Sequence, residues 1–371
     1  MWQIIMTLLF LAEIAGFVYL ASRIYRFGFT KRISHGNKRT GIAVCLAIVL
    51  LLFVGLWLWM GYMNAVICIL HLVAFSLIFD GIFWLVGKMS KKKMKPYYAV
   101  AAAVIFSVCY LTAGWHLAHD VRQTSYTIET EKATGNLRIV LFSDSHIGTT
   151  FDGAGFLTYV NEMQEKHPDV VVITGDFVDD DTSKEDMIAA CSALGTLKTT
   201  YGVYYAFGNH DKGYYDAAYR GYDGDDLIAE LEKNQVIVLQ DESRLIDDRF
   251  YIIGRQDLSE EAESGGTRET MSGLTEPLDM DKFTIVLDHQ PCDYENQVRA
   301  GVDLVLSGHT HGGQLFPLAF ISGLVSENEK IYGYEKQGNT NFIVTSGISD
   351  WAIRFKTGCK SEYVVIDVKG N

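Results

Sequence analysis

Four long apolar runs near the start of the chain limit what it can fold into. They cover about residues 4–20, 41–60, 65–86 and 98–117 of the 371 residues. Each is close to the roughly 20 residues that an α-helix needs to cross the hydrocarbon core of a bilayer. We therefore expect residues 1–120 to form a four-helix transmembrane anchor in a cell membrane.

Basic residues between these runs predict the orientation of the anchor. Six Lys and Arg lie between residues 23 and 39 and five Lys between residues 88 and 95, whereas residues 61–64 carry no charge. The positive-inside rule places the first and third connections in the cytoplasm. The run at 98–117 contains no charged residue and no polar face, so we expect it to span the membrane. The remainder of the chain is then predicted to be extracytoplasmic.

Three ionisable residues, Glu13, His71 and Asp80, lie inside the apolar runs. Ionisable groups within a membrane are costly and often functional. Pairing within the helix bundle and contact with a lipid headgroup are both open interpretations. No motif surrounds these residues, and their pattern favours structural pairing.

The charge of the chain is divided unevenly. Residues 1–120 carry a net charge of +8 and the remainder −21. A domain this acidic does not attract nucleic acid through its overall field, so we expect no nucleic-acid partner. The six cysteines show no spacing typical of a zinc ligand pair, which predicts free thiols.

Five short apolar segments in the second part of the chain run into residues that can bind metals. The segments are residues 137–142, 170–173, 203–207, 283–287 and 302–306. They read as buried strands, and amphipathic helical patterns lie among them, which indicates an α/β fold. Ligands of open α/β sheets bind beyond the carboxyl ends of the strands, so we expect the five ends to converge.

The residues that follow these strands form five motifs in order. They are Asp-x-His at 144–146, Gly-Asp-x-x-Asp at 175–179, Gly-Asn-His-Asp at 208–211, a lone histidine at 289 and Gly-His-x-His at 308–311. Taken alone, the last motif fits a solvated polar loop as well as a metal site. Together, the motifs make the chain resemble the calcineurin-like metallophosphoesterase superfamily, and its end resembles the bacterial membrane-anchored members.

The resemblance covers about residues 137–368 and implies a fold and a domain organisation. The implied fold is an α/β four-layer αββα sandwich, here preceded by the transmembrane region. We expect a metallophosphoesterase catalytic domain at residues 137–371. Residues 121–136 are polar and predict a linker, although a single exposed strand is an alternative.

The resemblance also implies a centre with two divalent transition metal ions. One ion would be held by Asp144, His146, Asp176 and His311, and the other by Asp176, Asn209, His289 and His309. Asp176 would bridge the two ions and offset their mutual repulsion. Mixed nitrogen and oxygen ligation suits manganese, iron or zinc better than calcium or magnesium.

Two further residues receive catalytic roles from the resemblance. His210 would stand over the phosphate as general acid or charge stabiliser. Asp179 would orient His210 through a hydrogen bond. Protein phosphatases of this superfamily carry an arginine directly after the second aspartate of Gly-Asp-x-x-Asp, whereas this chain carries Asp180 and Asp181. Two carboxylates cannot replace that cation, which argues against a phosphoprotein substrate.

Two polar segments near the motifs have open interpretations. Residues 212–226 contain four tyrosines, which either contact the substrate or pack in the interior. Residues 260–278 are acidic and rich in Gly and Ser, and they predict a surface loop that can fold over the site.

The sequence thus predicts a membrane-anchored phosphoesterase. A metal-bound hydroxide would hydrolyse a phosphate ester or anhydride, and tethering beside a bilayer favours a lipid-linked substrate. One alternative is a hydrolase of nucleotides or general phosphodiesters. Another is a metal-bound sensor or scaffold without catalytic activity. The complete set of ligand residues argues against this second alternative.

Overall fold

The computed structural model describes residues 2–91, 95–262, 265–316 and 328–371. The chain forms two compact units, residues 1–114 and 115–371. Lys92 and Lys93, two of the basic residues used to predict the orientation, lie outside the described residues.

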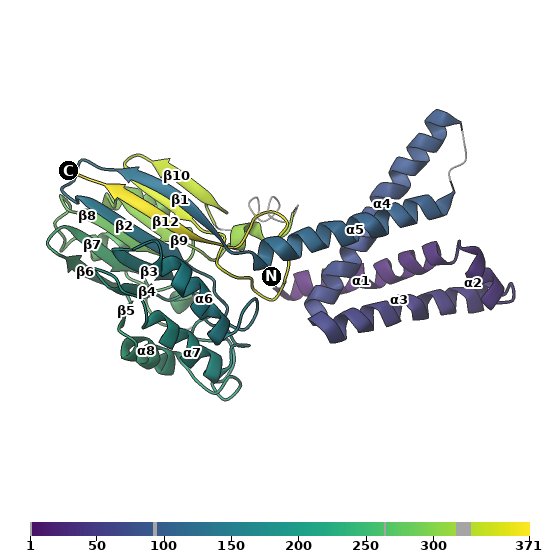
Figure 1. Cartoon of the computed structure of the whole chain (residues 1–371), viewed down its shortest axis with the longest axis horizontal. Helices are drawn as coiled ribbons and strands as arrows, with labels where there is room; N and C mark the ends of the chain where they lie inside the picture. Colours follow the sequence, from purple (N-terminus) through teal and green to yellow (C-terminus); the bar gives the residue numbers. More distant parts are fainter. Residues whose placement is uncertain (1, 92–94, 263–264, 317–327) are drawn as a thin grey trace. The chain divides into compact units, whose positions relative to one another are not determined.

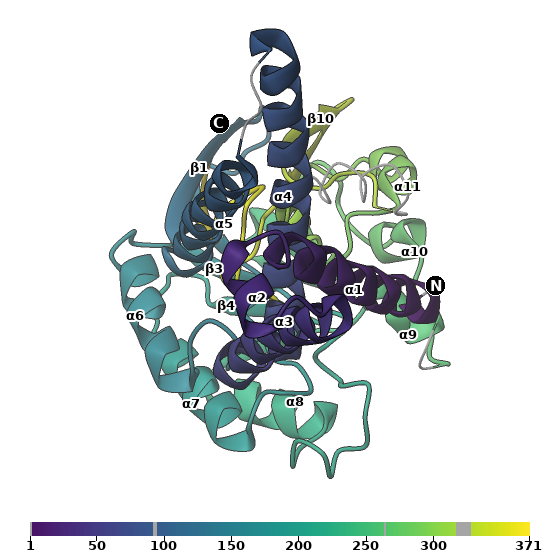
Figure 2. The same ribbon diagram turned by 90° about the vertical axis from the view of Figure 1, so that its right-hand side faces the viewer.

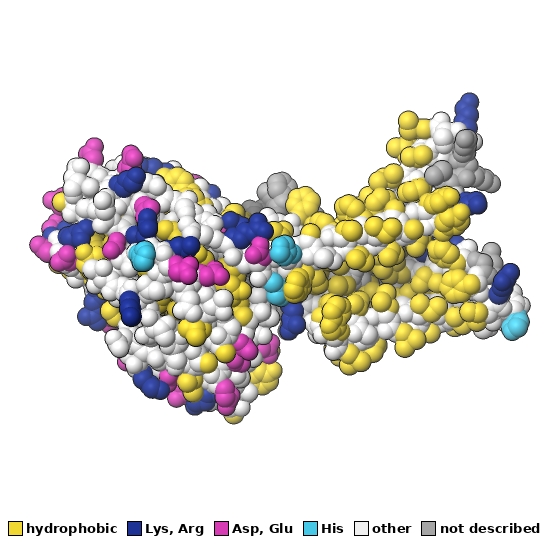
Figure 3. Space-filling view, in the orientation of Figure 1, with side chains coloured by type: hydrophobic (Ala, Val, Ile, Leu, Met, Phe, Trp, Pro, Cys, Tyr) yellow, Lys and Arg dark blue, Asp and Glu magenta, His cyan; other side chains and the backbone are white. Residues whose placement is uncertain are grey.

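Long helices build the first unit. Its elements are α1 (Trp2–Ile24), α2 (Gly28–Ile33), α3 (Lys38–Met60), α4 (Tyr62–Ser90) and the greater part of α5 (Pro96–His119). Among the described residues, four helices are long and apolar enough to cross a membrane, at residues 7–24, 38–60, 62–90 and 97–119. Hydrophobic side chains dominate their visible surface (Figure 3), and Leu58 and Trp59 are 82% and 76% exposed. The four predicted apolar helices are therefore present.

Two of the three ionisable residues inside the apolar runs pair with side chains of the first unit, and His71 Nδ1 lies 2.8 Å from the Ile67 carbonyl oxygen of its own helix. Asp80 forms an ion pair with Arg23 and accepts a hydrogen bond from Tyr19 Oη at 2.8 Å. Glu13 accepts a hydrogen bond from Tyr62 Oη at 3.0 Å. Of the two interpretations of the sequence, the structure shows internal pairing for Glu13 and Asp80.

Within the described residues, the second unit contains two six-stranded sheets (Figure 1). The first has the order β1-β12-β2-β3-β4-β5, and the second has the order β10-β11-β9-β8-β7-β6. Strands β2 to β5 are parallel, as are β7, β8, β9 and β11. The strands are β1 (Arg122–Glu129), β2 (Asn136–Phe142), β3 (Val170–Thr174), β4 (Val203–Ala206), β5 (Val236–Leu239), β6 (Glu242–Ile246), β7 (Phe250–Gly254), β8 (Phe283–Leu287), β9 (Leu304–Ser307), β10 (Gly333–Gln337), β11 (Thr340–Val344) and β12 (Glu362–Lys369).

Alternating side chains divide the second unit into layers. In β3, Val170 and Val172 belong to the core between the sheets, whereas Val171 and Ile173 face the helical layer on the other side. The helices are α6 (Gly153–Gln164), α7 (Lys184–Leu194) and α8 (Gly224–Lys233) on the first sheet, then α9 (Leu258–Ala262), α10 (Met271–Thr275) and α11 (Tyr294–Ala300). Figure 2 shows α10 and α11 on the opposite side of the sheets from α6 and α7. The predicted αββα sandwich is confirmed.

Residues 121–136 differ from the predicted linker. Strand β1 pairs in parallel with β12, from Arg122 opposite Glu362 to Glu129 opposite Lys369. It lies at the edge of the first sheet, and only Ile128 of its side chains is buried. An edge strand with one buried residue has little apolar signal, so the linker interpretation was wrong and the strand alternative describes this segment.

The two polar segments with open interpretations also differ from simple loops. Residues 260–278 contain α10, whose Met271 and Leu274 pack beneath the second sheet, and residues 263–264 lie outside the described residues. In residues 212–226, Tyr222 is buried beneath the guanidinium of Arg220, whereas Tyr214 remains 49% exposed. The tyrosines therefore divide between core packing and the surface.

Candidate metal centre

The carboxyl ends of five parallel strands bring the predicted ligands together. Strands β2, β3, β4, β8 and β9 lead directly into the five motifs. Two groups result, in each of which the potential ligand atoms lie within 4.8 Å of one another. We call Asp144, His146 and His311 the first group, and Asp176, His289 and His309 the second group.

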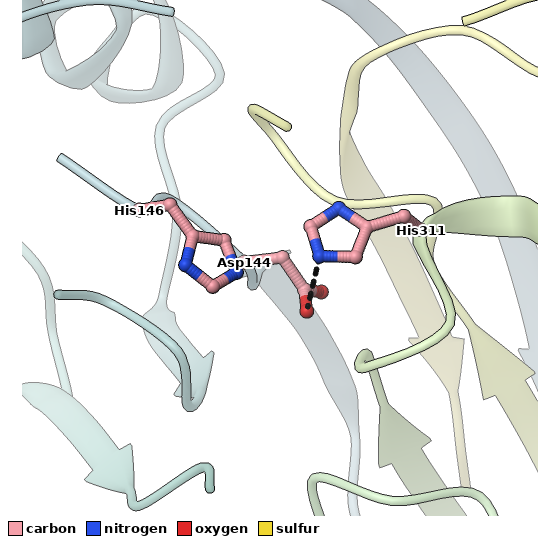
Figure 4. Close-up of side chains that lie close together, drawn as sticks. All are labelled: Asp144, His146 and His311. Carbon is pink, nitrogen blue, oxygen red and sulfur yellow. Dashed lines mark ion pairs between the residues drawn. The ribbon is translucent and has the colours of Figure 1, made fainter. Parts of the chain in front are cut away.

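The first group contains a buried imidazole nitrogen that has no hydrogen-bond partner among the described residues. Figure 4 shows the three side chains pointing toward one another, with Asp144 Oδ1 3.6 Å from His311 Nε2. His146 Nδ1 lies 3.1 Å from Asp179 Oδ2, so this nitrogen donates its proton to the carboxylate. The opposite nitrogen, His146 Nε2, is buried and has no hydrogen-bond partner among the described residues. A buried lone pair of this kind fits a metal ion.

The second group gathers lone pairs around one point. His289 Nδ1 lies 2.6 Å from the Thr174 carbonyl oxygen and donates to it. His289 Nε2 then faces Asp176 Oδ2 at 3.1 Å and Asn209 Oδ1 at 3.2 Å, and neither oxygen can donate a proton when Asp176 is ionised. Asn209 Oδ1 also lies 2.9 Å from His309 Nδ1. A neutral His309 can donate from Nδ1 to Asn209 Oδ1, but His289 Nε2 and Asp176 Oδ2 are two acceptors that face each other, and a cation fits between them.

Electrostatics point in the same direction. Burial would raise the pKa of Asp176, but the positive charge of the surrounding histidines, His289 foremost, holds it well below its usual range. Burial would lower the pKa of His289, but the attraction of Asp176 raises it well above its usual range. The pair therefore favours a carboxylate beside an imidazolium, whose proton supplies the positive charge that a divalent ion would supply.

The two histidines of the last motif have lowered pKa values, in contrast to His289. Burial and the neighbouring His289 lower the pKa of His309 to about 4. Burial and the neighbouring His146 hold the pKa of His311 well below its usual range. Both imidazoles are therefore neutral near pH 7, which is the form that binds metals.

Backbone strain marks the same residues. The φ angles are 54° at Asp144, 36° at His146, 51° at Asp176, 70° at His309 and 48° at His311. Residues other than glycine rarely adopt these angles, which cost on the order of 1–3 kcal/mol each and cluster at functional sites. The surrounding structure must hold these turns in place.

Asp211 supplies much of this restraint. Its carboxylate accepts hydrogen bonds from the backbone nitrogens of Asp176 at 2.9 Å, Phe177 at 2.8 Å and Gly208 at 2.7 Å. The turns after β3 and β4 are thereby tied to each other. Burial, followed by repulsion from Asp176, raises the pKa of Asp211 to about 6. Its place as the last residue of Gly-Asn-His-Asp was visible in the sequence, but its role was not.

Glycine is required where the motifs approach one another. A Cβ atom at Gly308 would overlap the side chains of Ser143 and Asp144. The backbone nitrogen of His309 can therefore donate to both carboxylate oxygens of Asp144, at 2.9 and 3.1 Å. This close approach joins the turn after β9 to the turn after β2, and so joins the two sheets at the site.

His210 lies beside both groups and belongs to neither. Its backbone nitrogen donates to Asp176 Oδ1 at 2.8 Å. The centroid of its ring lies 5.1 Å from that of His146, and 5.0 Å from those of Tyr214 and Trp351. Burial lowers its pKa, so the ring is neutral near pH 7.

The structure corrects the expected partner of Asp179. Its carboxylate accepts a hydrogen bond from His146 Nδ1, and none between Asp179 and His210 is present in the described part of the chain. A local turn sets this direction, because Asp179 Oδ1 accepts from the backbone nitrogen of Asp181 at 2.9 Å. Asp179 therefore orients a candidate metal ligand. The aromatic neighbours of His210 are Tyr214, one of the four tyrosines for which the sequence left substrate contact open, and Trp351, which sequence reasoning did not place at the site.

Comparison with known proteins reveals extensive similarity. A family model described as calcineurin-like phosphoesterase matches residues 137–313. An uncharacterized metallophosphoesterase of Aquifex aeolicus is 30% identical over 279 residues, which are 72% of this chain and 99% of that protein. A transmembrane protein with metallophosphoesterase domain from Danio rerio is 32% identical over 73% of this chain and 62% of its own length.

The similarity to a bacterial relative has a comparable extent. An uncharacterized metallophosphoesterase of Campylobacter jejuni is 31% identical over 248 residues, which are 66% of this chain and 63% of that protein. The matched region thus spans somewhat less than two thirds of the Campylobacter and Danio relatives.

Proposed function

This chain belongs to the calcineurin-like phosphoesterase family, and we propose that it hydrolyses a lipid-linked phosphate ester or anhydride at a centre of two divalent metal ions. Membership of the family makes the chain a metal-dependent phosphoric ester hydrolase. The apolar helices and the similarity to transmembrane relatives make it a membrane protein.

The convergence of acceptor atoms in the second group is the observation that carries the proposal. His289 Nε2 and Asp176 Oδ2 face each other there at 3.1 Å without a proton between them unless His289 is charged, and Asn209 Oδ1 lies 3.2 Å from the same nitrogen. The first group adds Asp144 and two histidines, and Asp176 lies between the groups, with Oδ2 3.7 Å from His146 Nε2. Two manganese, iron or zinc ions fit these donors and would polarise a phosphoryl group and acidify a water molecule.

The protein side chains around the ions would orient the substrate and stabilise charge. His210 projects beside both groups, and its neutral ring can donate an N–H hydrogen bond to a phosphoryl or leaving-group oxygen. Its backbone nitrogen holds Asp176, so the position of the ring is coupled to that of the bridging carboxylate. Asp179 holds His146 through Nδ1 and leaves Nε2 free to bind a metal.

Tethering to a bilayer supports a lipid-linked substrate. The apolar helix α5 ends at His119, and β1 begins only three residues later, at Arg122. Ser361 fixes the end of this helix, because its backbone nitrogen donates to Leu117 O at 2.9 Å and its hydroxyl to Ala118 O at 2.7 Å. The catalytic unit therefore starts directly at an apolar helix, and we propose residues 1–120 as the anchor and the sheets as the hydrolase.

A substrate panel tests the reaction. Full-length protein purified in detergent and loaded with manganese is given phospholipids, a polyprenyl phosphate, nucleotides and a chromogenic phosphodiester. We expect turnover of a lipid-borne phosphate that a matched His210→Ala variant loses. Preference for nucleotides would replace the lipid assignment. Equal, negligible turnover by both proteins would favour a sensor or scaffold.

Cysteine labelling tests the side of the membrane. Asn339 is exposed in the turn between β10 and β11, so Asn339→Cys offers a site for a membrane-impermeant maleimide. Extra labelling of intact spheroplasts, relative to the unmodified chain, is expected for an extracytoplasmic domain. Labelling only after lysis would place the domain in the cytoplasm and would leave the assignment of the metal centre unchanged.

A further inference from the structure

Tyr214 and Trp351 are both aromatic neighbours of His210. Their ring centroids each lie 5.0 Å from that of the imidazole, with interplanar angles of 89° for Tyr214 and 42° for Trp351. Tyr214 is exposed and Trp351 is half-buried, so each presents part of an aromatic face next to the metal centre. Neither residue belongs to a motif that binds metal.

Asp180 holds the tyrosine in this position. Its carboxylate accepts hydrogen bonds from the backbone nitrogens of Tyr214 at 3.1 Å and Tyr215 at 3.2 Å. Asp180 is the residue that takes the place of the arginine expected in phosphoprotein phosphatases. The carboxylate at this position therefore anchors an aromatic loop instead of providing a cation for phosphate.

The hydroxyl of Tyr214 has a second effect. It accepts a hydrogen bond from Asn209 Nδ2 at 2.7 Å. This bond fixes which end of the amide faces the metal centre, because Oδ1 is left to point at His289 and His309. Tyr214 is thus a positioning residue for the proposed ligand Asn209, in addition to being a neighbour of His210.

The loop of Trp351 is held independently of His210. Gln314 Nε2 donates to Ile353 O at 2.7 Å, and Ala352 adopts a left-handed φ of 57°. The fully buried ammonium of Lys356 donates to Ser346 O at 2.7 Å and to Ser349 O at 2.9 Å. A strained turn between two such restraints is preorganised, so the backbone that carries Trp351 is held in place before any substrate binds.

We infer that Tyr214 and Trp351 form an aromatic wall that selects the organic group on the substrate phosphate. The inference rests on the proposed hydrolase function and narrows it to phosphates that carry a large group with an apolar or aromatic face. Such a group gains contact with both rings, whereas a small hydrophilic group does not. An acylglycerol and a nucleobase share this chemistry, and the experiment below separates them.

Two chromogenic diesters with the same leaving group test the wall. Bis(p-nitrophenyl) phosphate and methyl p-nitrophenyl phosphate differ only in the second substituent, which is aromatic in one and a methyl group in the other. In the manganese-loaded full-length protein we expect kcat/KM to favour the aromatic diester. Trp351→Ala should reduce this preference about tenfold and Trp351→Phe by less than about threefold, in keeping with the typical energy of an aromatic contact.

Matched tyrosine variants separate the wall from the positioning role. Tyr214→Phe keeps the ring and removes the hydroxyl, so it should weaken binding of one metal ion about tenfold and leave the diester preference unchanged. Tyr214→Ala should weaken binding of that metal ion and also reduce the preference for the aromatic diester. Tyr215→Ala, at the exposed neighbouring tyrosine, serves as the control and should alter neither.

Short-chain phosphatidylcholine and a dinucleotide identify the source of the large group. The wall stands if Trp351→Ala lowers turnover of either one more than that of the methyl diester. An equal loss for every substrate would show that Trp351 only supports His210, and an unchanged preference would show that it contacts no substrate. Either result overturns the wall.

An equilibrium binding measurement tests the aromatic wall separately from the proposed hydrolysis. Calorimetry compares diphenyl phosphate with dimethyl phosphate on the wild-type protein and on Trp351→Ala, without any need for turnover. Tighter binding of diphenyl phosphate that disappears in the variant supports the wall even if no ester is hydrolysed. Equal binding of both phosphates to the wild-type protein would overturn the wall while leaving hydrolysis intact.

Discussion

In the first ligand group, Asp144 Oδ1 and His311 Nε2 stay 3.6 Å apart, whereas in the second His289 Nε2 lies 3.1 Å from Asp176 Oδ2. Neighbouring groups hold the first group open, because the backbone nitrogen of His309 donates to the Asp144 carboxylate and the Asp179 carboxylate accepts from His146 Nδ1. The second group closes through a proton on His289. Under the proposed two-ion centre, an ion would enter the first group with little rearrangement and would enter the second group in exchange for that proton.

Removing the charge shared by the groups should have the largest effect. Asp176→Asn abolishes the carboxylate between both groups, so we expect both ions to be lost and activity to fall at least about 10³-fold, equivalent to about 4 kcal/mol. Elemental analysis and turnover of a chromogenic diester measure the two effects. Two ions per chain in the variant would refute the bridging role.

Truncating the His210 side chain should lower the rate of hydrolysis and leave metal binding by both groups unchanged. His210→Ala leaves the backbone nitrogen that holds Asp176, so we expect both ions to remain while kcat falls by about 10²–10⁴-fold. Metal content and turnover are measured on the same preparation. Parallel loss of metal and activity would make His210 a ligand.

A substitution of Asp179, the hydrogen-bond partner of His146, should change the metal affinity of the first group only. Asp179→Asn weakens the hydrogen bond to His146 Nδ1 and touches only the first group, so affinity for one ion should fall about 10–100-fold. Titration of the apoprotein with manganese is expected to show one weakened and one unchanged site. Weakening of both sites would mean that the groups are not independent.

Acidification should give the smallest of these effects, a difference in the pH at which the two groups release their ions. Asp176 raises the pKa of His289 well above its usual range, and the pKa of His146 is raised less far. Protons compete with metal below these pKa values, so the second ion should be released first as pH falls and retained as pH rises. Metal content after dialysis at a series of pH values measures the order. Simultaneous release, or earlier loss of the first ion, would contradict it.

The sequence was sufficient for the parts that repeat a simple pattern. Long apolar runs predicted four helices, because an apolar segment of about 20 residues has the length that a membrane-spanning helix needs. Apolar strands followed by ligand residues predicted that Asp144, His146, Asp176, His289, His309 and His311 would meet, because the carboxyl ends of parallel strands share an edge. The order of the five motifs was enough to identify the family.

Only the tertiary structure decided features that depend on side-chain direction and distant pairing. Strand β1 exists because β12 supplies its hydrogen bonds from more than 230 residues along the chain, and its polar edge hides it from pattern recognition. The turn at Asp181 sends Asp179 toward His146 and away from His210. Trp351 reaches His210 through a loop set by buried Lys356. Residue spacing fixes which face of a strand a side chain occupies, but hydrogen bonds between loops fix where a side chain beyond the strand's end points.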